Sequence, residues 1–227
     1  MASKRLPGKH RMDEMQDPSP WIVRFADLLP TGGHVLDLAS GGGRHGRFFL
    51  DRGHPVTALD RDVAALEHFQ LTLNRQAARS PARPPIDHDP ARMFWGWPGG
   101  GAGGSDYIEN ALSPRENLEI IQHDLEAGGP WPLGGRRFAA VVVVNYLYRP
   151  LLPAIIQAVA PGGLLLYDTF AAGNEAFGRP ANPDFLLRPD ELTDAVAGEL
   201  EVVDFFQGRI EVPKPAIKQQ ICARRSG

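Results

Sequence analysis

Short apolar runs alternate with amphipathic segments along most of the chain, and clusters of Gly, Pro or polar residues separate them. Runs rich in Val, Leu and Ile are typical of strands, and four consecutive valines in one of them indicate a strand buried on both faces. We expect strands at 34–39, 55–60, 118–124, 137–148, 164–170, 199–208 and 216–225.

Apolar residues recur at helical spacing in the segments between these runs. The first helix is expected to begin at Ser19 as the N-cap, with Pro20 in its first position. Further helices are expected from the glycine loop to Asp51 and at 61–77, 150–160 and 190–197. This alternation predicts an α/β fold: a Rossmann-like, doubly wound, mostly parallel seven-stranded sheet with an antiparallel last strand.

Two segments lack this pattern. Residues 1–18 are polar and are expected to form a flexible tail, whereas residues 79–117 are rich in Pro and Gly and contain no periodic run. The second segment is too long for an ordinary connection, so it predicts a functional lid or a disordered insert. Its aromatic residues, among them Trp95 and Trp97, favour a segment that docks on the domain for at least part of the time. We therefore expect a single domain at 19–227 that carries this insert.

The composition is that of an ordinary globular protein: 227 residues, 43% hydrophobic and 22% charged, with a formal net charge of −3 at pH 7. The net charge therefore gives no overall electrostatic attraction to nucleic acid. The single cysteine, Cys222, excludes an internal disulfide or a cysteine metal cluster and suits a reducing cytosol. No apolar run approaches the roughly 18 residues of a membrane span, so we expect a cytoplasmic protein with no membrane partner.

A glycine cluster follows the first expected strand, in the segment VLDLASGGGRHGRFF at Val35–Phe49. Gly41 to Gly46 satisfies the dinucleotide pattern G-x-G-x-x-G, in which Gly41 and Gly43 let the backbone approach a ligand closely. Asp60 ends the next strand, at a spacing that lets a carboxylate accept both hydroxyls of a ribose. A dinucleotide and S-adenosylmethionine both fit these features.

Three further features bear on which nucleotide binds. Asp37 lies in the lead-in to the loop, where a carboxylate suits a ligand with an ammonium group, such as the methionine part of S-adenosylmethionine. Arg61 follows Asp60 and keeps NADP binding open. Hydride-transferring enzymes of the short-chain type need a Tyr four residues before a Lys, and none of the four lysines has that partner.

Together with residues further along, this segment resembles the class I S-adenosylmethionine-dependent methyltransferases, and among them the small bacterial tellurite-resistance group. The resemblance covers about 21–225, apart from the insert. It lies in Val35–Arg44, Asp60, Gln122-His123-Asp124-Leu125, Asn145-Tyr146, Pro161-Gly162-Gly163 and the loop 173–192.

The resemblance implies S-adenosylmethionine as the cofactor. The loop backbone would cradle its methionine part, with Asp37 beside the ammonium group; Asp60 would hold the ribose, and Asp124 with the Leu125 amide would hold the adenine. Ala39 stands where the family usually has its first glycine, which puts only the closeness of the cofactor carboxylate in doubt. The implied cofactor-binding residues are Asp37, Ala39, Gly41, Gly43, Asp60, Arg61, Asp124, Leu125, Asn145 and Tyr146.

A small molecule is the expected methyl acceptor. The fourth strand ends Asn145-Tyr146-Leu147-Tyr148 and lacks both prolines of N-P-P-Y, which disfavours nucleic acid and protein amides. The resemblance suggests a soft nucleophile such as a chalcogen or thiol. Arg179 and Arg188 would favour an anionic acceptor if they face the site. Weak candidates for acceptor binding are Trp21, Arg24, Tyr148 and Arg149, each of which also has a purely structural interpretation.

No catalytic residue is assigned. His45 lies beside the loop, but we expect it to pack on the first turn of its helix rather than act as a base. Asp87-His88-Asp89 resembles a metal site, yet no second ligand group has helical spacing to it, so no metal is expected. An NAD(P)-binding oxidoreductase and a catalytically silent nucleotide-binding protein stay open as alternatives, and the sequence does not indicate an oligomeric state.

Overall fold

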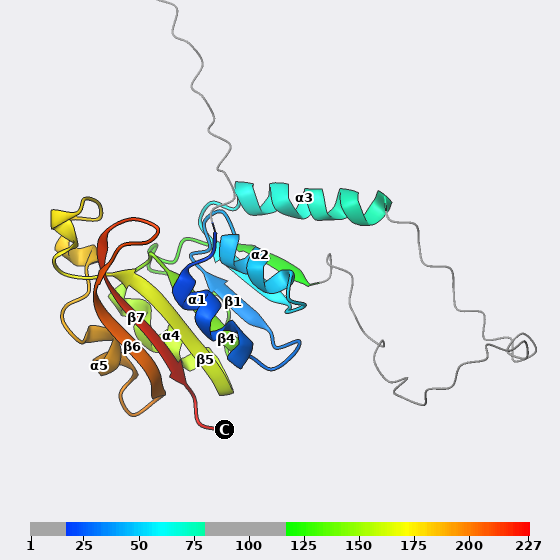
Figure 1. Ribbon diagram of the computed structural model, residues 1–227. Helices are drawn as coiled ribbons and strands as arrows, with labels where there is room; N and C mark the ends of the chain where they lie inside the picture. The colour runs from blue at the N-terminus through cyan, green and yellow to red at the C-terminus, as the bar shows by residue number, and fades with distance from the viewer. Residues whose placement is uncertain (1–16, 80–116) are drawn as a thin grey trace, which may run out of the picture.

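Seven strands lie in one sheet in the computed structural model, which describes residues 17–79 and 117–227 (Figure 1). The strands are β1 (Val35–Leu38), β2 (Val56–Asp60), β3 (Leu118–Gln122), β4 (Phe138–Val144), β5 (Val159–Phe170), β6 (Glu201–Ile210) and β7 (Ala216–Arg224). Their order is β3-β2-β1-β4-β5-β7-β6. The first five strands pair in parallel, whereas β7 is antiparallel to both β5 and β6. The predicted fold class and the antiparallel last strand are confirmed.

Helices cover both faces of the sheet (Figure 1). They are α1 (Pro20–Phe25), α2 (Arg44–Leu50), α3 (Ala64–Arg79), α4 (Leu152–Gln157) and α5 (Glu191–Val196). One apolar cluster joins the sheet to α1, α2 and α3 and includes Trp21, Phe49 and Leu66. A second cluster joins the other face to α4 and α5 and includes Ile155 and Leu192. The sheet is therefore a middle layer between two cores.

The run of valines in β4 serves both cores at once. Val141 and Val143 belong to the cluster with α4 and α5, whereas Val142 and Val144 belong to the cluster with α1, α2 and α3. Successive side chains of a strand point to opposite faces, so a central strand with both faces covered has no polar position. The predicted burial on both faces is confirmed.

The two largest differences from the predicted boundaries are in β4 and β5. β4 ends at Val144 rather than at Tyr148, because Asn145 adopts a left-handed backbone conformation with φ of 57°. β5 begins at Val159 rather than at Leu164, because Val159 pairs with Phe138 before a bulge in the ladder. The expected turn at Pro161-Gly162-Gly163 is therefore absorbed into a strand.

The predicted tail, the insert and the Asp87-His88-Asp89 triplet lie at least in part outside the described ranges, so those expectations stay predictions. In the described ranges, no helix combines the length and the apolar character needed to cross a membrane.

Candidate functional site

The glycine loop joins β1 to α2 in a conformation that favours residues without a side chain. Gly41 and Gly43 have φ of 55° and 74°, and Ala39 also adopts a positive φ of 51°. A Cβ on Gly43 would lie 2.3 Å from Cδ2 of Leu66 in α3, whereas a Cβ on Gly41 or Gly42 would meet no atom within 4 Å. The backbone at Gly41 and Gly42 is thus open to a ligand, while Gly43 is required for packing.

Asp37 holds this loop in place. Its carboxylate is buried and accepts a hydrogen bond from the Gly46 backbone N–H at 2.8 Å. Burial raises the pKa of Asp37 to about 7, against the lowering effect of the Gly46 hydrogen bond and the Arg44 charge. In the described structure Asp37 therefore fastens the first turn of α2 to β1, and its contact with a ligand ammonium group stays a prediction.

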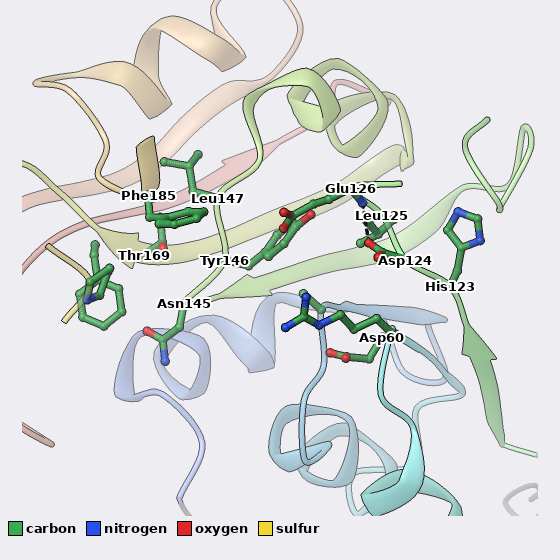
Figure 2. A pocket seen from close by; sticks show the side chains of 14 residues that line it. Asp60, His123, Asp124, Leu125, Glu126, Asn145, Tyr146, Leu147, Thr169 and Phe185 are labelled. Atoms are coloured by element: carbon green, nitrogen blue, oxygen red, sulfur yellow. Dashed lines mark hydrogen bonds between the residues drawn. The ribbon is translucent and has the colours of Figure 1, made fainter. Parts of the chain in front are cut away.

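A pocket of about 510 Å³ opens where the carboxyl ends of the parallel strands meet (Figure 2). This is the edge of an open α/β sheet at which ligands bind. One end is lined by Ala39, Asp60, Arg61, His123, Asp124, Leu125 and Glu126. The other end is lined by Leu147, Thr169, Phe170, Pro180 and Phe185. Asn145 and Tyr146 lie between the two ends. Asp37, Gly41 and Gly43 belong to the adjoining loop rather than to the lining.

Two carboxylates are fixed by backbone groups at the first end. Asp60 accepts hydrogen bonds from the N–H of Gly41 at 2.7 Å and of Asp62 at 3.0 Å. Asp124 accepts one from the N–H of Glu126 at 2.9 Å. Each oxygen retains a lone pair, so both side chains are oriented acceptors for hydroxyl or amine donors.

Tyr146 presents an orphaned polar atom. Its hydroxyl is buried without a hydrogen-bond partner, and its backbone carbonyl accepts from the Tyr167 hydroxyl at 2.9 Å. Burial raises the pKa of Tyr146, so the phenol stays protonated. A buried unpaired hydroxyl in a pocket wall is satisfied when a ligand supplies the partner.

A buried polar network lies beneath Asn145. Lys218 of β7 forms an ion pair with Asp168 of β5 at 2.8 Å and donates to Asn145 Oδ1 at 2.7 Å. Asp168 also accepts from the Ser19 hydroxyl at 2.5 Å, and His45 Nε2 accepts from the Ser19 N–H at 3.1 Å. The network ties the start of α1 to the floor of the site.

His45 is part of this network rather than a base in the pocket. Burial, followed by the charge of Arg44, lowers its pKa to about 3, so the ring is neutral. It is 4% exposed and accepts from a backbone N–H. We expected His45 to pack on the first turn of its own helix; its hydrogen-bond partner is instead the backbone of Ser19, at the start of α1.

The four weak candidates for acceptor binding lie outside the pocket lining, and two of them belong to structural contacts near α1. Trp21 is buried against Phe25, with ring centroids 4.9 Å apart. Arg24 pairs with Asp204 of β6 at 2.6 Å. Tyr148 also lies outside the lining. These geometries favour the structural interpretation.

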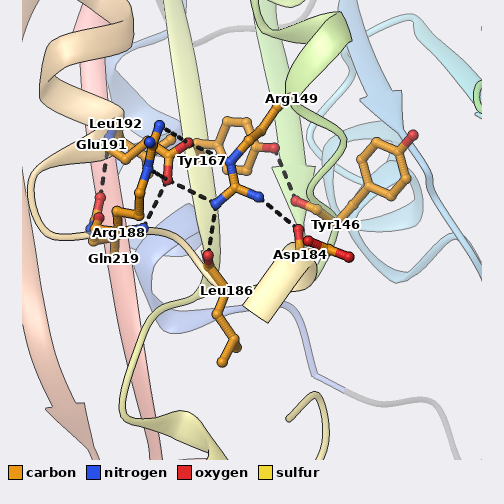
Figure 3. Close-up of polar contacts among 9 residues, drawn as sticks. All are labelled: Tyr146, Arg149, Tyr167, Asp184, Leu186, Arg188, Glu191, Leu192 and Gln219. Atoms are coloured by element: carbon orange, nitrogen blue, oxygen red, sulfur yellow. Dashed lines mark hydrogen bonds and ion pairs between the residues drawn. The ribbon is translucent and has the colours of Figure 1, made fainter. Parts of the chain in front are cut away.

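Arg149 organises the loop between β5 and α5 (Figure 3). Its guanidinium donates to Glu191 at 2.6 and 2.9 Å and to the carbonyls of Asp184 and Leu186 at 2.8 Å each. Burial disfavours the charged form of Glu191, but the hydrogen bonds from Arg149 and Arg188 have the larger effect and lower the pKa of Glu191 to about 2. Arg149 therefore acts through the loop, which carries the pocket-lining Phe185.

Among the described residues, no group of three His, Cys, Asp or Glu side chains is placed to hold a metal ion. The residues that the motifs did not predict are those of the apolar end and the Lys218–Asp168 pair. Lys218 is one of four lysines in the chain, and its place inside a predicted strand was the available signal.

Comparisons with known proteins bear on this geometry. No protein-family model matches the sequence, and no curated protein sequence matches it. Solved structures, in contrast, do match this chain. TehB from Haemophilus influenzae aligns with 90% of this chain at a TM-score of 0.60 and 16% identity, although the chain spans only 61% of TehB. The chain has the class I methyltransferase fold.

Two neighbours carry ligands in their crystals. The glycopeptide N-methyltransferase MtfA, in complex with S-adenosylhomocysteine, aligns over 92% of this chain and 90% of its own at a TM-score of 0.54 and 20% identity. The 1,6-didemethyltoxoflavin-N1-methyltransferase of Burkholderia thailandensis contains its acceptor and S-adenosylhomocysteine. It aligns over 91% of this chain and 76% of its own, at a TM-score of 0.54 and 17% identity.

Proposed function

We propose that this protein transfers a methyl group from S-adenosylmethionine to a small acceptor that carries no carboxylate or phosphate group. The observation that carries the proposal is the convergence of the glycine loop, Asp60, Asp124 and Asn145 around one pocket, at the ends of four neighbouring strands. Structural neighbours crystallised with S-adenosylhomocysteine support the same cofactor.

The residues fit the cofactor in three ways. The backbone at Gly41 and Gly42 is unobstructed, which suits the methionine part. Asp60 is an oriented acceptor at the end of β2, which suits a ribose. Asp124 and the Leu125 amide offer an acceptor and a donor, which suit the edge of an adenine.

Bound S-adenosylmethionine supplies a methyl carbon activated by the sulfonium: the acceptor lone pair forms the new bond, and the electron pair of the broken C–S bond returns to sulfur. The protein contributes orientation and a site from which water is excluded. Asn145 and Tyr146 lie between the two ends of the pocket, where they would fix the approach of the acceptor.

The apolar end of the pocket, at Leu147, Phe170, Pro180 and Phe185, favours an acceptor with an apolar, flat surface and no carboxylate or phosphate group. Its lining combines Leu147, Phe170, Pro180 and Phe185 with the hydroxyl of Thr169, and none of these is ionisable. Arg179 and Arg188 are both exposed, Arg188 with 76% of its side chain, and neither lines the pocket. This arrangement does not support the anionic acceptor that Arg179 and Arg188 would have favoured.

The same lining bears on the nucleophile. Proton transfer to a protein base is needed only when the nucleophile arrives protonated with a high pKa. No carboxylate or imidazole lines the apolar end, and burial keeps the Tyr146 phenol protonated. We therefore infer an acceptor whose lone pair is available near neutral pH, such as an aromatic thiol or a heteroaromatic nitrogen.

Calorimetric titration tests the cofactor. We expect S-adenosylhomocysteine to bind with micromolar affinity, and Asp60→Ala to weaken binding tenfold or more, because a hydrogen bond to a charged group contributes about 1.5–3 kcal/mol. Asp62→Ala is the matched control, since Asp62 caps the start of α3 and does not line the pocket. Equal affinity in both variants would contradict the assigned role of Asp60.

An NAD(P)-binding oxidoreductase is the second candidate, and the position of Arg61 in the pocket beside Asp60 favours it. NADPH is therefore titrated in parallel. Binding of NADPH in place of S-adenosylhomocysteine would replace the methyltransferase proposal. Binding of S-adenosylhomocysteine without turnover of any acceptor would favour a silent nucleotide-binding protein.

We also propose a cytoplasmic location and no nucleic-acid partner. Burial raises the pKa of Cys222 to about 12, against the lowering effect of the Arg224 charge, so this thiol has no tendency to react. The net charge of −3 offers no general attraction for nucleic acid.

A further inference from the structure

A buried lysine contacts the side chain that lies between the two ends of the pocket. Lys218 is 6% exposed, and its Nζ lies 2.7 Å from Asn145 Oδ1. Asn145 itself is exposed and lines the pocket (Figure 2). What Lys218 does to the amide of Asn145 therefore decides which hydrogen-bonding group faces a ligand.

The chemistry of the ammonium group fixes the orientation of that amide. A lysine ammonium has three donors and no acceptor, whereas an asparagine amide has an oxygen acceptor on one side and an NH₂ donor on the other. Only the oxygen can face Lys218, so the Nδ2 group is turned away from it. The part of the chain that the structure describes provides no hydrogen-bond acceptor for Nδ2 of Asn145.

Lys218 is itself held so that it cannot turn. Its Nζ lies 2.8 Å from Asp168 Oδ1 and 4.7 Å from the centre of the Phe170 ring. Asp168 is held in turn by the hydroxyl of Ser19. All three directions of the ammonium are thus occupied, by Asp168, by Asn145 and by an aromatic face.

The backbone of Asn145 is fixed as well. Its N–H donates to the carbonyl of Asp168 at 2.9 Å, and its φ of 57° is a conformation that Asn tolerates better than most residues. Neither the main chain nor the amide is free to rotate, so the donor direction of Nδ2 is set before any ligand arrives.

We propose that Lys218 is a positioning residue that fixes Asn145 as a hydrogen-bond donor toward the acceptor. The acceptor molecule would then carry a lone-pair group, such as an ether or carbonyl oxygen, next to its nucleophilic atom. An amine in that position would face another donor and be disfavoured. This inference rests on the proposed methyl transfer and narrows its substrate class.

Two aromatic thiols of similar shape test the proposal: 2-methoxybenzenethiol, which presents an ether oxygen beside the thiol, and 2-aminobenzenethiol, which presents an NH₂ group there. In each reaction the thiolate sulfur bonds the methyl carbon, S-adenosylhomocysteine leaves, and the thiol proton is taken up by buffer. The measured quantity is the ratio of kcat/KM for the two thiols at saturating S-adenosylmethionine, followed by formation of S-adenosylhomocysteine.

We expect the full-length protein to favour the methoxy compound about tenfold, the effect of one hydrogen bond. Asn145→Asp replaces the donor by a carboxylate oxygen and is expected to reverse the preference. Asn182→Asp is the matched control: Asn182 is exposed and lies outside the pocket lining, so the same change there leaves the ratio unchanged.

A double variant tests Lys218 without leaving a buried charge unpaired. Lys218→Met with Asp168→Asn frees the amide of Asn145 to rotate, so the ratio is expected to approach one. A role in stability alone would lower both rates together and leave the ratio as it was. The unfolding temperature and the S-adenosylhomocysteine affinity report whether this variant is folded; if it is not, Asn145→Asp carries the test.

Three results would overturn the inference: a preference for the amino compound in the unmodified protein, a ratio that Asn145→Asp does not change, or methylation of neither thiol by protein that binds S-adenosylhomocysteine. Absence of S-adenosylhomocysteine binding in the unmodified protein is a different result, because it removes the proposed function itself.

Discussion

Replacing Arg149 by Met should destabilise the protein by about 3 kcal/mol at pH 7. The carboxyl of Glu191 has its pKa lowered from 4.5 to about 2, and a difference of that size corresponds to about 3 kcal/mol of stabilisation of the charged form. Most of this disappears with Arg149, which supplies two of the hydrogen bonds to Glu191. Methionine keeps the apolar stem, so the change isolates the guanidinium.

The expected effect depends on pH in a defined direction. A lowered pKa contributes stability that is fully present above 4.5, the ordinary value, and is lost as the pH falls through about 2. The unmodified protein therefore approaches the variant in acid. The difference between them should shrink from about 3 kcal/mol at pH 7 to about 1.5 kcal/mol at pH 3.

Urea unfolding of both proteins at pH 7, 5, 4 and 3, followed by tryptophan fluorescence, measures this difference. Arg188→Met is the control, because the Arg188 side chain is 76% exposed and its ion pair with Glu191 is longer, at 3.4 Å. We expect less than about 1 kcal/mol for that change. A difference for Arg149→Met that stays constant from pH 7 to pH 3 would refute the reasoning, since it would mean that packing rather than the charge pair is lost.

Three further changes probe the glycine loop. Ala39→Gly should stabilise the protein by about 0.5–1 kcal/mol, because the strain of a positive φ at an alanine costs more than the extra conformational entropy that a glycine loses on folding. A lower unfolding temperature would contradict this. Gly43→Ala should destabilise the protein by about 1–3 kcal/mol and by more than Gly41→Ala, because both positions have a positive φ but only a Cβ on Gly43 meets another atom, Cδ2 of Leu66 at 2.3 Å; equal denaturation midpoints for the two variants would argue against the packing role. Asp37→Asn should gain stability relative to the unmodified protein as the pH rises from about 4 to about 7, because over that range the Asp37 carboxyl ionises in the unfolded chain but stays protonated in the folded one; urea midpoints that change in parallel over this range would show that the pKa of Asp37 is not raised by folding.

The sequence was most informative where one contiguous motif builds the site. The strand, glycine loop and helix at Val35–Phe49 are local, and their residue types follow from backbone geometry that the structure bears out at Gly41 and Gly43. Asp60 and Asp124 were located because each is the last residue of a predicted strand, and parallel strands bring such residues to one edge. The end of the pocket at Asp60 and Asp124 could therefore be outlined from the sequence.

The apolar end could not be outlined, because it is assembled from segments without a shared pattern. Thr169 and Phe170 close β5, whereas Pro180 and Phe185 come from a loop whose path depends on Arg149. That path is set by contacts across the chain rather than by neighbours in sequence. A polar loop of this kind gives no periodicity from which to place its side chains.

Lys218 shows why period-two patterns fail inside a sheet with two covered faces. The alternation of apolar and polar residues in β7 predicts a strand with one inner and one outer face, yet nearly every position from Ala216 to Ala223 is buried, because β7 lies between β5 and β6. A lysine in such a strand must find a charge partner within the fold, and Asp168 on the neighbouring β5 is that partner. The ion pair in turn needs a further acceptor for the ammonium, and the nearest one belongs to Asn145. Because Lys218 is buried, it needs both Asp168 and Asn145 as partners, and its hydrogen bond to Asn145 orients the amide of Asn145 in the pocket.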